Sequence, residues 1–413
     1  MSKERLLIFT DCYIYGGSER LMSFLVKNEV LMSKYEINFA FRAHDIYKRG
    51  MLDDFCDFSG KIIPVPLMAN ETIFYELNRL HLSDWIKNLI KTPFWLLKKL
   101  GVYTIFNSIF LLSILKKERP EILHINNGGF PGAASCNLLV FLAKFTSVRK
   151  IVYQVNNQAQ KNTIFNKKRN AQINEYVSSF VTSSNMAKNN LSHNAGMEIN
   201  KIHIVRNIVQ LNPITLSKSQ ILKNFRLPTN TFILTNVAFL TKRKGQIYLL
   251  KALKKWLDAQ TTEINICLFL IGDGEDYTLL LNYCQQNDLK KYVHFLGYQS
   301  NYADYINAAD LVVFPSISDE DLPLVIIESL MLGKCILGTA LAGISEVIID
   351  ENNGVLVNPD VLSLVDDLSA KIDFLYSKPD EIMRLAQGAK ISSENFSETR
   401  YGEKLDNIYK YAK

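Results

Sequence analysis

The chain has 413 residues, a length that predicts two compact domains rather than one. Its 48% hydrophobic and 21% charged residues are typical of a globular protein, and its six cysteines follow no spacing that suggests a disulfide framework or a zinc site, which favours a reducing compartment. The net charge is +6, and because the positive excess lies in the first 210 residues, that half should face an anionic partner such as a phosphorylated substrate, an anionic lipid or a nucleic acid.

The N-terminal stretch MSKERLLIFTDCY contains an apolar run that is too short for a signal peptide and predicts a first strand. Gly16 and Gly17 follow in YIYGGSERL and predict a helix start that Ser18 could cap. Backbone N–H groups at a helix start suit a phosphate, which glycine allows to approach closely. An ordinary strand-to-helix turn is the alternative, since the pair lacks the third glycine and the downstream acid of a dinucleotide fingerprint.

Basic and aromatic residues are interleaved in DWIKNLIKTPFWLLKKLGVYTIFNSIFLLSILKKERP, residues 84–120. They include Lys87, Lys91, Lys98, Lys99, Trp85, Phe94 and Trp95. Such a pattern suits a helix in the headgroup region of an anionic membrane, whereas a pair of ordinary helices with lysines facing water is the alternative. The apolar run 100–115 is shorter than the roughly 20 residues of a spanning helix. We therefore expect a cytoplasmic protein in peripheral contact with the inner face of the cytoplasmic membrane.

Short apolar runs typical of strands alternate with helix-like segments along the chain, as in RLLIF and EINFAF, and later FILTNVAF, NICLFLIG and LVVFPS. This alternation predicts an α/β fold of two doubly wound, Rossmann-like domains. A segment rich in Asn, Pro, Ser and Thr near residue 210 predicts domains at 1–209 and 210–395, with a ligand cleft between them. A helix over about 396–413 either closes the second domain or packs back on the first, because Tyr401, Leu405, Ile408 and Tyr411 have helical spacing.

Two turns of the second half could bind a nucleotide. The basic run 242–244 follows the strand FILTNVAF, and its three cations could neutralise a diphosphate. Gly272 and Gly274 make a tight turn in LIGDGEDYTLL that could border a nucleotide base. Taken alone, a solvated basic turn and an ordinary tight turn are the alternatives.

Two glutamates flank an aliphatic run in SDEDLPLVIIESL. Pro323 predicts the first turn of a helix that Gly333 ends, so Glu320 precedes the helix and Glu328 lies inside it, roughly 7 to 8 Å along the axis. Carboxylates at that separation cannot share one metal ion, but they can bind two hydroxyl-bearing parts of one elongated ligand. A loop acid and a surface acid are the alternative, which the aliphatic neighbours of Glu328 disfavour.

Together these motifs resemble the retaining glycosyltransferases of family 4, which have the two-domain GT-B architecture. The segment EDLPLVIIE, from Glu320 to Glu328, resembles the Glu-x7-Glu signature of that family. The following GKCILGTALAGISEVIIDENNGVLV is similar to the family's next run of turns and strands. The resemblance covers nearly the whole chain and is strongest from Thr235 to Val357.

The resemblance implies a reaction as well as a fold. A sugar would pass from a UDP- or GDP-linked donor to a glycan or lipid-linked acceptor with retention of anomeric configuration, as in the synthesis of bacterial surface polysaccharide or lipopolysaccharide. The leaving phosphate would take the proton of the acceptor, so the reaction needs stabilisation of charge on the diphosphate more than a protein nucleophile. No metal ion or other cofactor is expected.

The resemblance also implies roles for individual residues. Glu320 would bind the transferred sugar, Glu328 the ribose and Lys244 the diphosphate. Asn156 would orient the acceptor hydroxyl, so Glu320, Lys244 and Asn156 would act in catalysis. Further donor contacts would come from Gly16, Gly17, Arg243, Gly272 and Gly274, and from the backbone amides of Ala342, Gly343 and Ile344.

Several positions depart from the family pattern. Phe239 stands five residues before Lys244, where the family has an arginine, so Arg243 or Lys242 would have to replace it. Asp321 follows Glu320 in place of a glycine, and its charge could favour an amino sugar.

Two more departures lie in or near the first domain. Asn156 and Asn157 stand where many members have a histidine, and asparagine can orient a hydroxyl but takes no proton at neutral pH. The segment Arg206–Ile208 replaces the usual Pro-Asn-Gly between the domains.

Other interpretations remain open at this point. A sugar-nucleotide epimerase or a phosphorolytic enzyme could share the two-domain build, and Phe239 permits a non-catalytic subunit that kept the fold. A nucleic-acid-binding protein is not expected, because the basic residues do not lie on one short aromatic-rich sheet.

Overall fold

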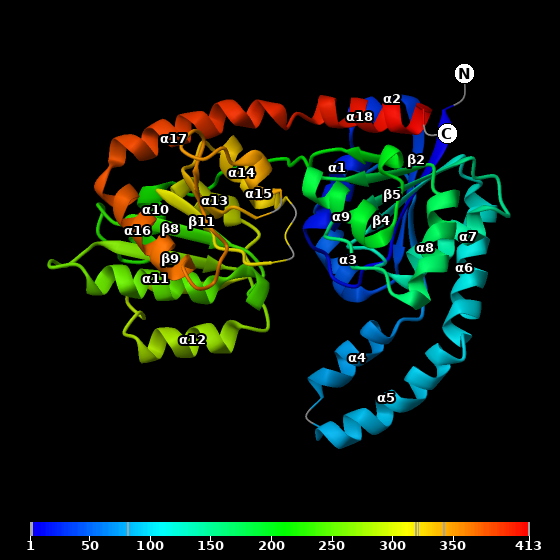
Figure 1. Ribbon diagram of the computed structural model, residues 1–413, viewed down its shortest axis with the longest axis horizontal. Coiled ribbons are helices and arrows are strands. Elements are labelled where there is room, and N and C mark those ends of the chain that lie inside the picture. Colours follow the sequence, from blue (N-terminus) through cyan, green and yellow to red (C-terminus); the bar gives the residue numbers. More distant parts are fainter. Residues whose placement is uncertain (1–2, 81, 319, 321, 342, 412–413) are drawn as a thin grey trace. The chain divides into compact units, whose positions relative to one another are not determined.

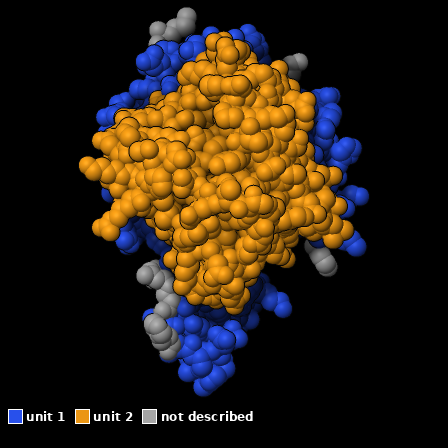
Figure 2. Space-filling model, turned by 90° about the vertical axis from the view of Figure 1, so that its left-hand side faces the viewer, with its two compact units in different colours: residues 1–206, 398–413 blue, residues 207–397 orange. Residues whose placement is uncertain are grey.

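The computed structural model describes residues 3–80, 82–318, 320, 322–341 and 343–411, without the side chains of residues 72, 76, 79 and 165 (Figure 1). Asp321 and Ala342, which both carried predictions, lie outside the described residues. The chain divides into unit 1, residues 1–206 with 398–413, and unit 2, residues 207–397 (Figure 2). Unit 2 therefore begins at Asn207, whereas composition placed a boundary near residue 210.

Within the described residues, unit 1 contains a seven-stranded parallel sheet with the order β3-β2-β1-β4-β5-β6-β7. The strands are β1 (Glu4–Thr10), β2 (Tyr35–Arg42), β3 (Ile62–Val65), β4 (Ile122–Asn127), β5 (Lys150–Val155), β6 (Ser179–Thr182) and β7 (Ile202–Ile204). Its helices are α1 (Gly17–Val26), α2 (Glu29–Lys34), α3 (Asp45–Met51), α4 (Asn70–Arg79), α5 (Asp84–Lys99), α6 (Val102–Glu118), α7 (Ala134–Ala143), α8 (Ile164–Tyr176), α9 (Asn185–Ala195), η1 (Ile199–Lys201) and α18 (Glu398–Tyr411).

Unit 2 contains, in its described part, a six-stranded parallel sheet with the order β10-β9-β8-β11-β12-β13. The strands are β8 (Phe232–Val237), β9 (Ile266–Ile271), β10 (Val293–Gly297), β11 (Leu311–Phe314), β12 (Ile336–Thr339) and β13 (Val355–Val357). The helices are α10 (Lys218–Asn224), η2 (Lys242–Lys244), α11 (Gln246–Asp258), α12 (Tyr277–Gln286), α13 (Tyr302–Ala308), α14 (Leu324–Met331), α15 (Ile344–Val347), α16 (Leu364–Ser377), α17 (Pro379–Ser392) and η3 (Ser393–Asn395).

These two parallel sheets confirm the predicted α/β class with two Rossmann-like halves. In unit 1 the strand order reverses between β1 and β4, and in unit 2 between β8 and β11. Ligands of open α/β sheets bind at the carboxyl ends of the strands beside such a reversal. The loops that follow β1, β4, β8 and β11 are therefore the places to look for a site.

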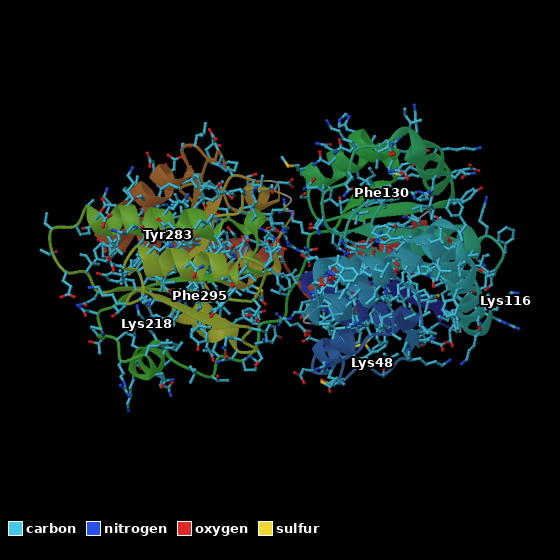
Figure 3. The ribbon with its side chains drawn as sticks, turned by 90° about the horizontal axis from the view of Figure 1, so that it is seen from below. Lys48, Lys116, Phe130, Lys218, Tyr283 and Phe295 are labelled. Atoms are coloured by element: carbon cyan, nitrogen blue, oxygen red, sulfur yellow. The ribbon has the colours of Figure 1, made fainter. Side chains whose placement is uncertain are left out.

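Each unit has a core of its own. Phe130 of unit 1 (Figure 3) is buried, and its ring centroid lies 5.8 Å from that of Tyr153 on β5. In unit 2 the buried Trp256 of α11 donates from Nε1 to Asp373 of α16 at 2.9 Å. Truncating buried aromatic residues of this size costs about 3 to 5 kcal/mol, so each unit draws stability from its own core.

The C-terminal helix α18 belongs to unit 1, which answers what its periodicity left open. It contacts α2 and β5, and Asp406 accepts hydrogen bonds from Lys34 at 2.6 Å and from Tyr35 at 2.9 Å. Its apolar stripe includes Tyr409 instead of the predicted Tyr411, which is 77% exposed. Tyr411 thus lies outside the buried stripe, although its spacing from Ile408 is helical.

Helices α4 and α5 extend away from the sheet of unit 1 (Figure 1). None of the residues of α5, all of which are described, is buried. No single helix of the described chain is long and apolar enough to cross a membrane, whereas α5 and α6 together meet that test of length and composition but are bent by 63°.

Candidate functional site

The carboxyl edge of the unit 2 sheet brings Lys244 and Glu320 together. Lys244 ends η2 after β8, Glu320 lies in the loop after β11, and these two strands are neighbours. The Lys244 ammonium donates to Glu320 Oε2, and the same oxygen lies 3.4 Å from Arg243 and accepts from Ser316 at 3.2 Å. Two of the predicted catalytic residues thus form an ion pair at the point where the strand order reverses.

This ion pair is nearly buried, which changes the chemistry of its members. Burial lowers the pKa of Lys244, the charge of Glu320 raises it, and the neighbouring Arg243 lowers it again, so that the net direction is downward. A buried charge is stable only when it is paired with an opposite charge. The Lys244 ammonium would therefore bind strongly to an anion that took the place of the Glu320 carboxylate. A diphosphate would compete with Glu320 for the Lys244 ammonium.

Gly245 makes this arrangement possible. It has a positive φ of 71°, and a Cβ atom at this position would lie 1.9 Å from the carbonyl oxygen of Pro315. The backbone N–H of Ile317 also donates to the Arg243 carbonyl at 2.8 Å. Only glycine allows the loops after β8 and β11 to approach so closely.

Glu328 lies inside α14, as predicted, and its side chain is buried. Its Oε1 accepts a hydrogen bond of 2.5 Å from Tyr302 at the start of α13. The role predicted for Glu328 in ribose binding stays a prediction. Sequence reasoning did not find Tyr302, because no local pattern relates α13 to α14.

The structure explains why residues 272 and 274 are glycines, which the sequence did not reveal. A Cβ atom on Gly272 would lie 2.1 Å from the Ala238 carbonyl oxygen, and one on Gly274 would lie 2.2 Å from that of Leu240. The turn after β9 is thus packed directly on the loop after β8. Its predicted contact with a nucleotide base stays a prediction.

Phe239 lies in that same loop and is 49% exposed. Of its two suggested replacements, Arg243 lies beside Glu320, whereas the Lys242 side chain is exposed. Arg243 is therefore the second cation of this site.

The backbone around Gly343 is partly engaged within unit 2. Ile344 begins the short helix α15, is fully buried and donates its N–H to the Leu341 carbonyl at 3.0 Å. Gly343 precedes that helix, and its carbonyl accepts from the Glu346 N–H at 3.2 Å. Binding of sugar or phosphate by these amides stays a prediction.

Gly16 and Gly17 begin α1 after β1, as predicted. Gly16 is the N-cap residue, and its carbonyl accepts from the backbone of Glu19 at 3.1 Å and of Arg20 at 2.9 Å. The prediction that Ser18 caps the helix was wrong: it lies within the first turn and donates to the Glu19 carboxylate at 3.2 Å. The predicted role of the glycine pair in diphosphate binding stays a prediction.

Asn156 joins the ends of β4 and β5. Its Nδ2 donates to Asn126 Oδ1 at 2.6 Å and to the Asn127 carbonyl at 3.0 Å, and its Oδ1 accepts from Gln154 at 2.8 Å. Asn156 is thus held in place by its own sheet. Its predicted contact with an acceptor hydroxyl stays a prediction.

Glu19 is a functional candidate that sequence reasoning missed, although it stands in the GGSER stretch. It is 2% exposed and accepts from Asn126 at 3.1 Å, Thr10 at 2.9 Å and Tyr47 at 2.7 Å. Burial raises its pKa to about 7, although the hydrogen bonds from Tyr47 and Thr10 lower it.

A continuous chain of hydrogen bonds leads from this carboxylate to α18. Asn126 and Asn156 are followed by Gln154, which lies 3.0 Å from His124 Nε2, and His124 Nδ1 lies 2.8 Å from the Tyr409 hydroxyl. Because Gln154 donates to Asn156, its oxygen accepts from His124, which assigns the proton of the neutral imidazole to Nε2. Every donor in the chain then points toward Glu19, an arrangement in which hydrogen bonds strengthen one another.

One family model matches most of unit 2 in the comparison with known proteins. Residues 217–392 match the family of group 1 glycosyl transferases. This match contains the Lys244–Glu320 pair and is to glycosyl transferases of group 1 in general. The alignments with the first curated relatives span between 35% and 41% of the length of those proteins.

A relative from Escherichia coli, UDP-Gal:alpha-D-GlcNAc-diphosphoundecaprenol alpha-1,3-galactosyltransferase, is 25% identical over 63% of this chain and 68% of its own. Among solved structures, a glycosyltransferase from Rickettsia africae has a TM-score of 0.75 at 18% identity, covering 99% of this chain and 98% of its own. HepE from Anabaena in complex with UDP has a TM-score of 0.73 at 16% identity, covering 98% and 99%. At these identities the structures show a common fold.

Proposed function

We propose that the protein transfers a sugar from a UDP- or GDP-linked donor to a glycan or lipid-linked acceptor, in the synthesis of a bacterial surface polysaccharide or lipopolysaccharide. The observation that carries the proposal is the convergence of Lys244 and Arg243 on Glu320 at the strand reversal of unit 2. The family match over this region supports it, as do the UDP bound to HepE and the donor and acceptor in the name of the Escherichia coli relative.

The proposed reaction is retaining and independent of metal ions. Lys244 and Arg243 would stabilise the charge that develops on the leaving diphosphate, a contribution that is usually the largest single one at such sites. Once the diphosphate engages Lys244, Glu320 can accept hydrogen bonds from hydroxyls of the transferred sugar, with Ser316 still donating to it.

The test is a thermal-shift screen with UDP-glucose, UDP-galactose, UDP-N-acetylglucosamine and GDP-mannose. A donor at a hundred times its Kd stabilises the folded protein by about 2.7 kcal/mol, a shift of a few degrees. Lys244→Met combined with Glu320→Gln removes both charges of the pair together and should abolish the shift. Lys255→Met, which removes an exposed lysine paired with Asp366, should keep it.

Two outcomes would overturn the proposal. One is a wild-type protein that no donor stabilises, and the other is an equal shift in the double variant. Proton NMR of the donor adds a second readout, because conversion of the sugar nucleotide into an isomer without acceptor would indicate an epimerase.

We also propose that α5 and α6 form a membrane-contact surface for an anionic membrane, on the inner face of the cytoplasmic membrane. The large apolar side chains exposed on these helices are Trp85, Leu89, Ile90, Trp95, Leu96, Val102, Ile105 and Ile109. Lys87, Lys91, Lys98 and Lys99 lie on α5, and the exposed Lys116 lies near the end of α6 (Figure 3). Apolar side chains with interleaved lysines favour the headgroup region of anionic lipids.

Vesicle binding tests this surface directly. The chain has three tryptophans, and because Trp256 is buried, a blue shift of emission on vesicle binding reports Trp85 and Trp95. The variant with both replaced by serine lacks these reporters, so its binding is measured by co-sedimentation with vesicles and should be about tenfold weaker. In the same assay, Lys98→Gln with Lys99→Gln should reduce the preference for phosphatidylglycerol over phosphatidylcholine. Phe145→Ser, at an exposed apolar residue outside the surface, is the control. Equal binding by all four proteins would exclude the membrane-contact surface.

A further inference from the structure

The carboxyl edge of unit 1 holds a second cluster of polar groups, on the β2 side of β1. β1 and β2 are adjacent, with Thr10 opposite Phe41, so Asp11 and Arg42 lie at the same edge. Arg42 donates to one carboxylate oxygen of Asp11, and Ser135 of α7 donates to the other. The ion pair is buried, and burial raises the pKa of Asp11 even though the charge of Arg42 lowers it.

Two buried polar side chains nearby have atoms without a hydrogen-bond partner among the described residues. Asn70, the first residue of α4, is 3% exposed, and neither its Nδ2 nor its Oδ1 has a hydrogen-bond partner among the described residues. The hydroxyl of Tyr103 on α6, which is 5% exposed, also lacks one within the described chain. An unsatisfied buried polar group is unfavourable, so these atoms are available to water or to a bound molecule.

Helix geometry places Tyr103 against the start of α4. Asn107 lies one turn after it and binds the backbone N–H of Met68 at 2.8 Å and the Met68 carbonyl at 3.1 Å. Because residues four apart share a helix face, Tyr103 faces the same segment, which leads directly into Asn70. Burial and then the charge of Glu71 raise the pKa of Tyr103, which agrees with a position close to the N-terminus of α4.

Aromatic rings adjoin these groups. The Tyr13 ring lies 6.0 Å from the Tyr75 ring and 6.1 Å from the His44 ring, measured between centroids. Tyr75 stands four residues after Glu71 on α4, so the two side chains share one face. Both tyrosine rings are partly exposed.

We propose that Asn70, Glu71 and Tyr103, with the rings of Tyr13 and Tyr75, bind an uncharged sugar ring, the head sugar of the acceptor. The amide and the hydroxyl offer donors and an acceptor to sugar hydroxyls, and aromatic faces suit the apolar side of the ring. This acceptor cluster deepens the proposed function and rests on it.

The charges of the region do not favour a phosphate as the ligand. Asp11 and Glu71 each lie beside a cation: Arg42 donates to Asp11, and Lys98 Nζ lies 3.9 Å from Glu71 Oε1. Because both cations are already paired with acids, the region has no excess positive charge to bind a phosphate, whereas an uncharged sugar needs none. The helix that carries Asn70 also leads along the chain to α5, so a lipid attached to the head sugar would lie toward the membrane-contact surface.

The test measures binding of octyl glycosides of glucose, galactose, mannose and N-acetylglucosamine to the full chain by saturation-transfer NMR, below their critical micelle concentrations. Octyl phosphate and octanol are the comparison ligands. Wild type should bind at least one glycoside, and Asn70→Ala should weaken that binding at least tenfold. Asn78→Ala, an exposed asparagine on the same helix, is the matched control and should change nothing.

A second readout separates ligand binding from a structural role. Because Asn70 makes no hydrogen bond with described residues, Asn70→Ala should leave Tm unchanged or raise it. A fall in Tm with unchanged glycoside binding would overturn the acceptor cluster, as would equal binding of octyl phosphate or octanol, or binding of no glycoside.

Donor thermal shifts on the same variants distinguish this inference from the proposed function. Asn70→Ala should keep the shift with a sugar nucleotide. A normal donor shift with no Asn70-dependent glycoside binding would overturn the acceptor cluster alone, whereas glycoside binding without any donor shift would overturn the proposed function.

Discussion

At the scale of single residues, this protein holds charged and strained groups where ordinary packing would exclude them. Glu19 is buried among neutral donors, and Gly245 has a backbone conformation that no other residue adopts easily. Glu19 follows β1 and Gly245 follows β8, and the strand order reverses beside each of these strands. Both residues therefore lie near the loops in which ligands of such sheets bind.

The carboxylate of Glu19 should make stability depend on pH. Its pKa is raised to about 7 in the folded state from an ordinary value of 4.5, so protonation favours folding. Its contribution is complete below pH 4.5 and is lost as pH rises through 7, a change of about 3 kcal/mol. Glu19→Gln should therefore be less sensitive to pH between 5 and 8 in thermal unfolding.

Comparing wild type with Glu19→Gln separates the pH dependence caused by Glu19 from that caused by His124, which both proteins contain. Burial lowers the pKa of His124 to about 4, so this histidine contributes the opposite slope, with stability lost as pH falls below 6.5. Glu29→Gln, at an exposed glutamate of α2, is the control and should keep the wild-type profile. Identical profiles for Glu19→Gln and wild type would contradict the prediction.

Gly245→Ala should destabilise unit 2 and weaken donor binding. A Cβ atom would clash with the Pro315 carbonyl, and the positive φ adds strain. Gly101→Ala separates the two contributions, because Gly101 has a similar φ of 77° and no atom within 4 Å of the added Cβ. Calorimetry should show about 1 kcal/mol for Gly101→Ala and at least twice that for Gly245→Ala. Equal losses would mean that the loop moves freely.

At the scale of elements, α18 is fixed to unit 1 by polar contacts as well as by its apolar stripe. Its Asp406 binds Lys34 and Tyr35, and the Tyr409 hydroxyl ends the hydrogen-bond chain that begins at Glu19. Burial raises the pKa of Asp406, while the hydrogen bonds from Lys34, Lys410 and Tyr35 lower it, with a net downward direction. α18 therefore stabilises unit 1 through hydrogen bonds as well as through apolar contacts.

Tyr409→Phe should show how much the hydrogen bond between the Tyr409 hydroxyl and His124 contributes to stability. The substitution keeps the ring and leaves Nδ1 of the buried His124 without its donor, which costs about 1 to 3 kcal/mol. Tyr411→Phe, on the same helix but exposed, should leave Tm unchanged. Equal Tm values for the two variants would show that the hydroxyl of Tyr409 contributes nothing.

At the scale of the whole molecule, the chain completes unit 2 before it returns to unit 1. Residues 207–397 form one continuous unit, whereas unit 1 is assembled from both ends of the chain. The last helix, α18, packs on elements of unit 1, and each of the two sheets has a separate hydrophobic core.

A chain that ends at Ser397 should therefore lose protection only in unit 1. Hydrogen exchange should become faster in α2 and β5, which α18 contacts, and stay unchanged in β8 and β9. A chain that ends at Tyr411 is the control. Faster exchange in β8 instead would mean that α18 stabilises the other unit.

Much of this architecture could be predicted from the sequence. Apolar runs of strand type and the turns between them are local, so they predicted two parallel sheets, and Pro323 and Gly333 predicted the bounds of α14 closely. The spacing of Glu320 and Glu328 also predicted which one lies inside the helix. The prediction for Ser18 failed because helix ends depend on the backbone around them.

The sequence by itself determined the class of the fold, the loops at which the candidate site lies and the motifs that point to a sugar nucleotide. Only the tertiary structure paired Lys244 with Glu320 and buried Glu19 beside Asn126. It also left Asn70 of α4 and the Tyr103 hydroxyl of α6 without hydrogen-bond partners in the part of the chain that is described. The physical reason is distance along the chain: periodicity and turn residues act over a few neighbours, whereas burial and pairing depend on strands and helices that meet only when each sheet has formed.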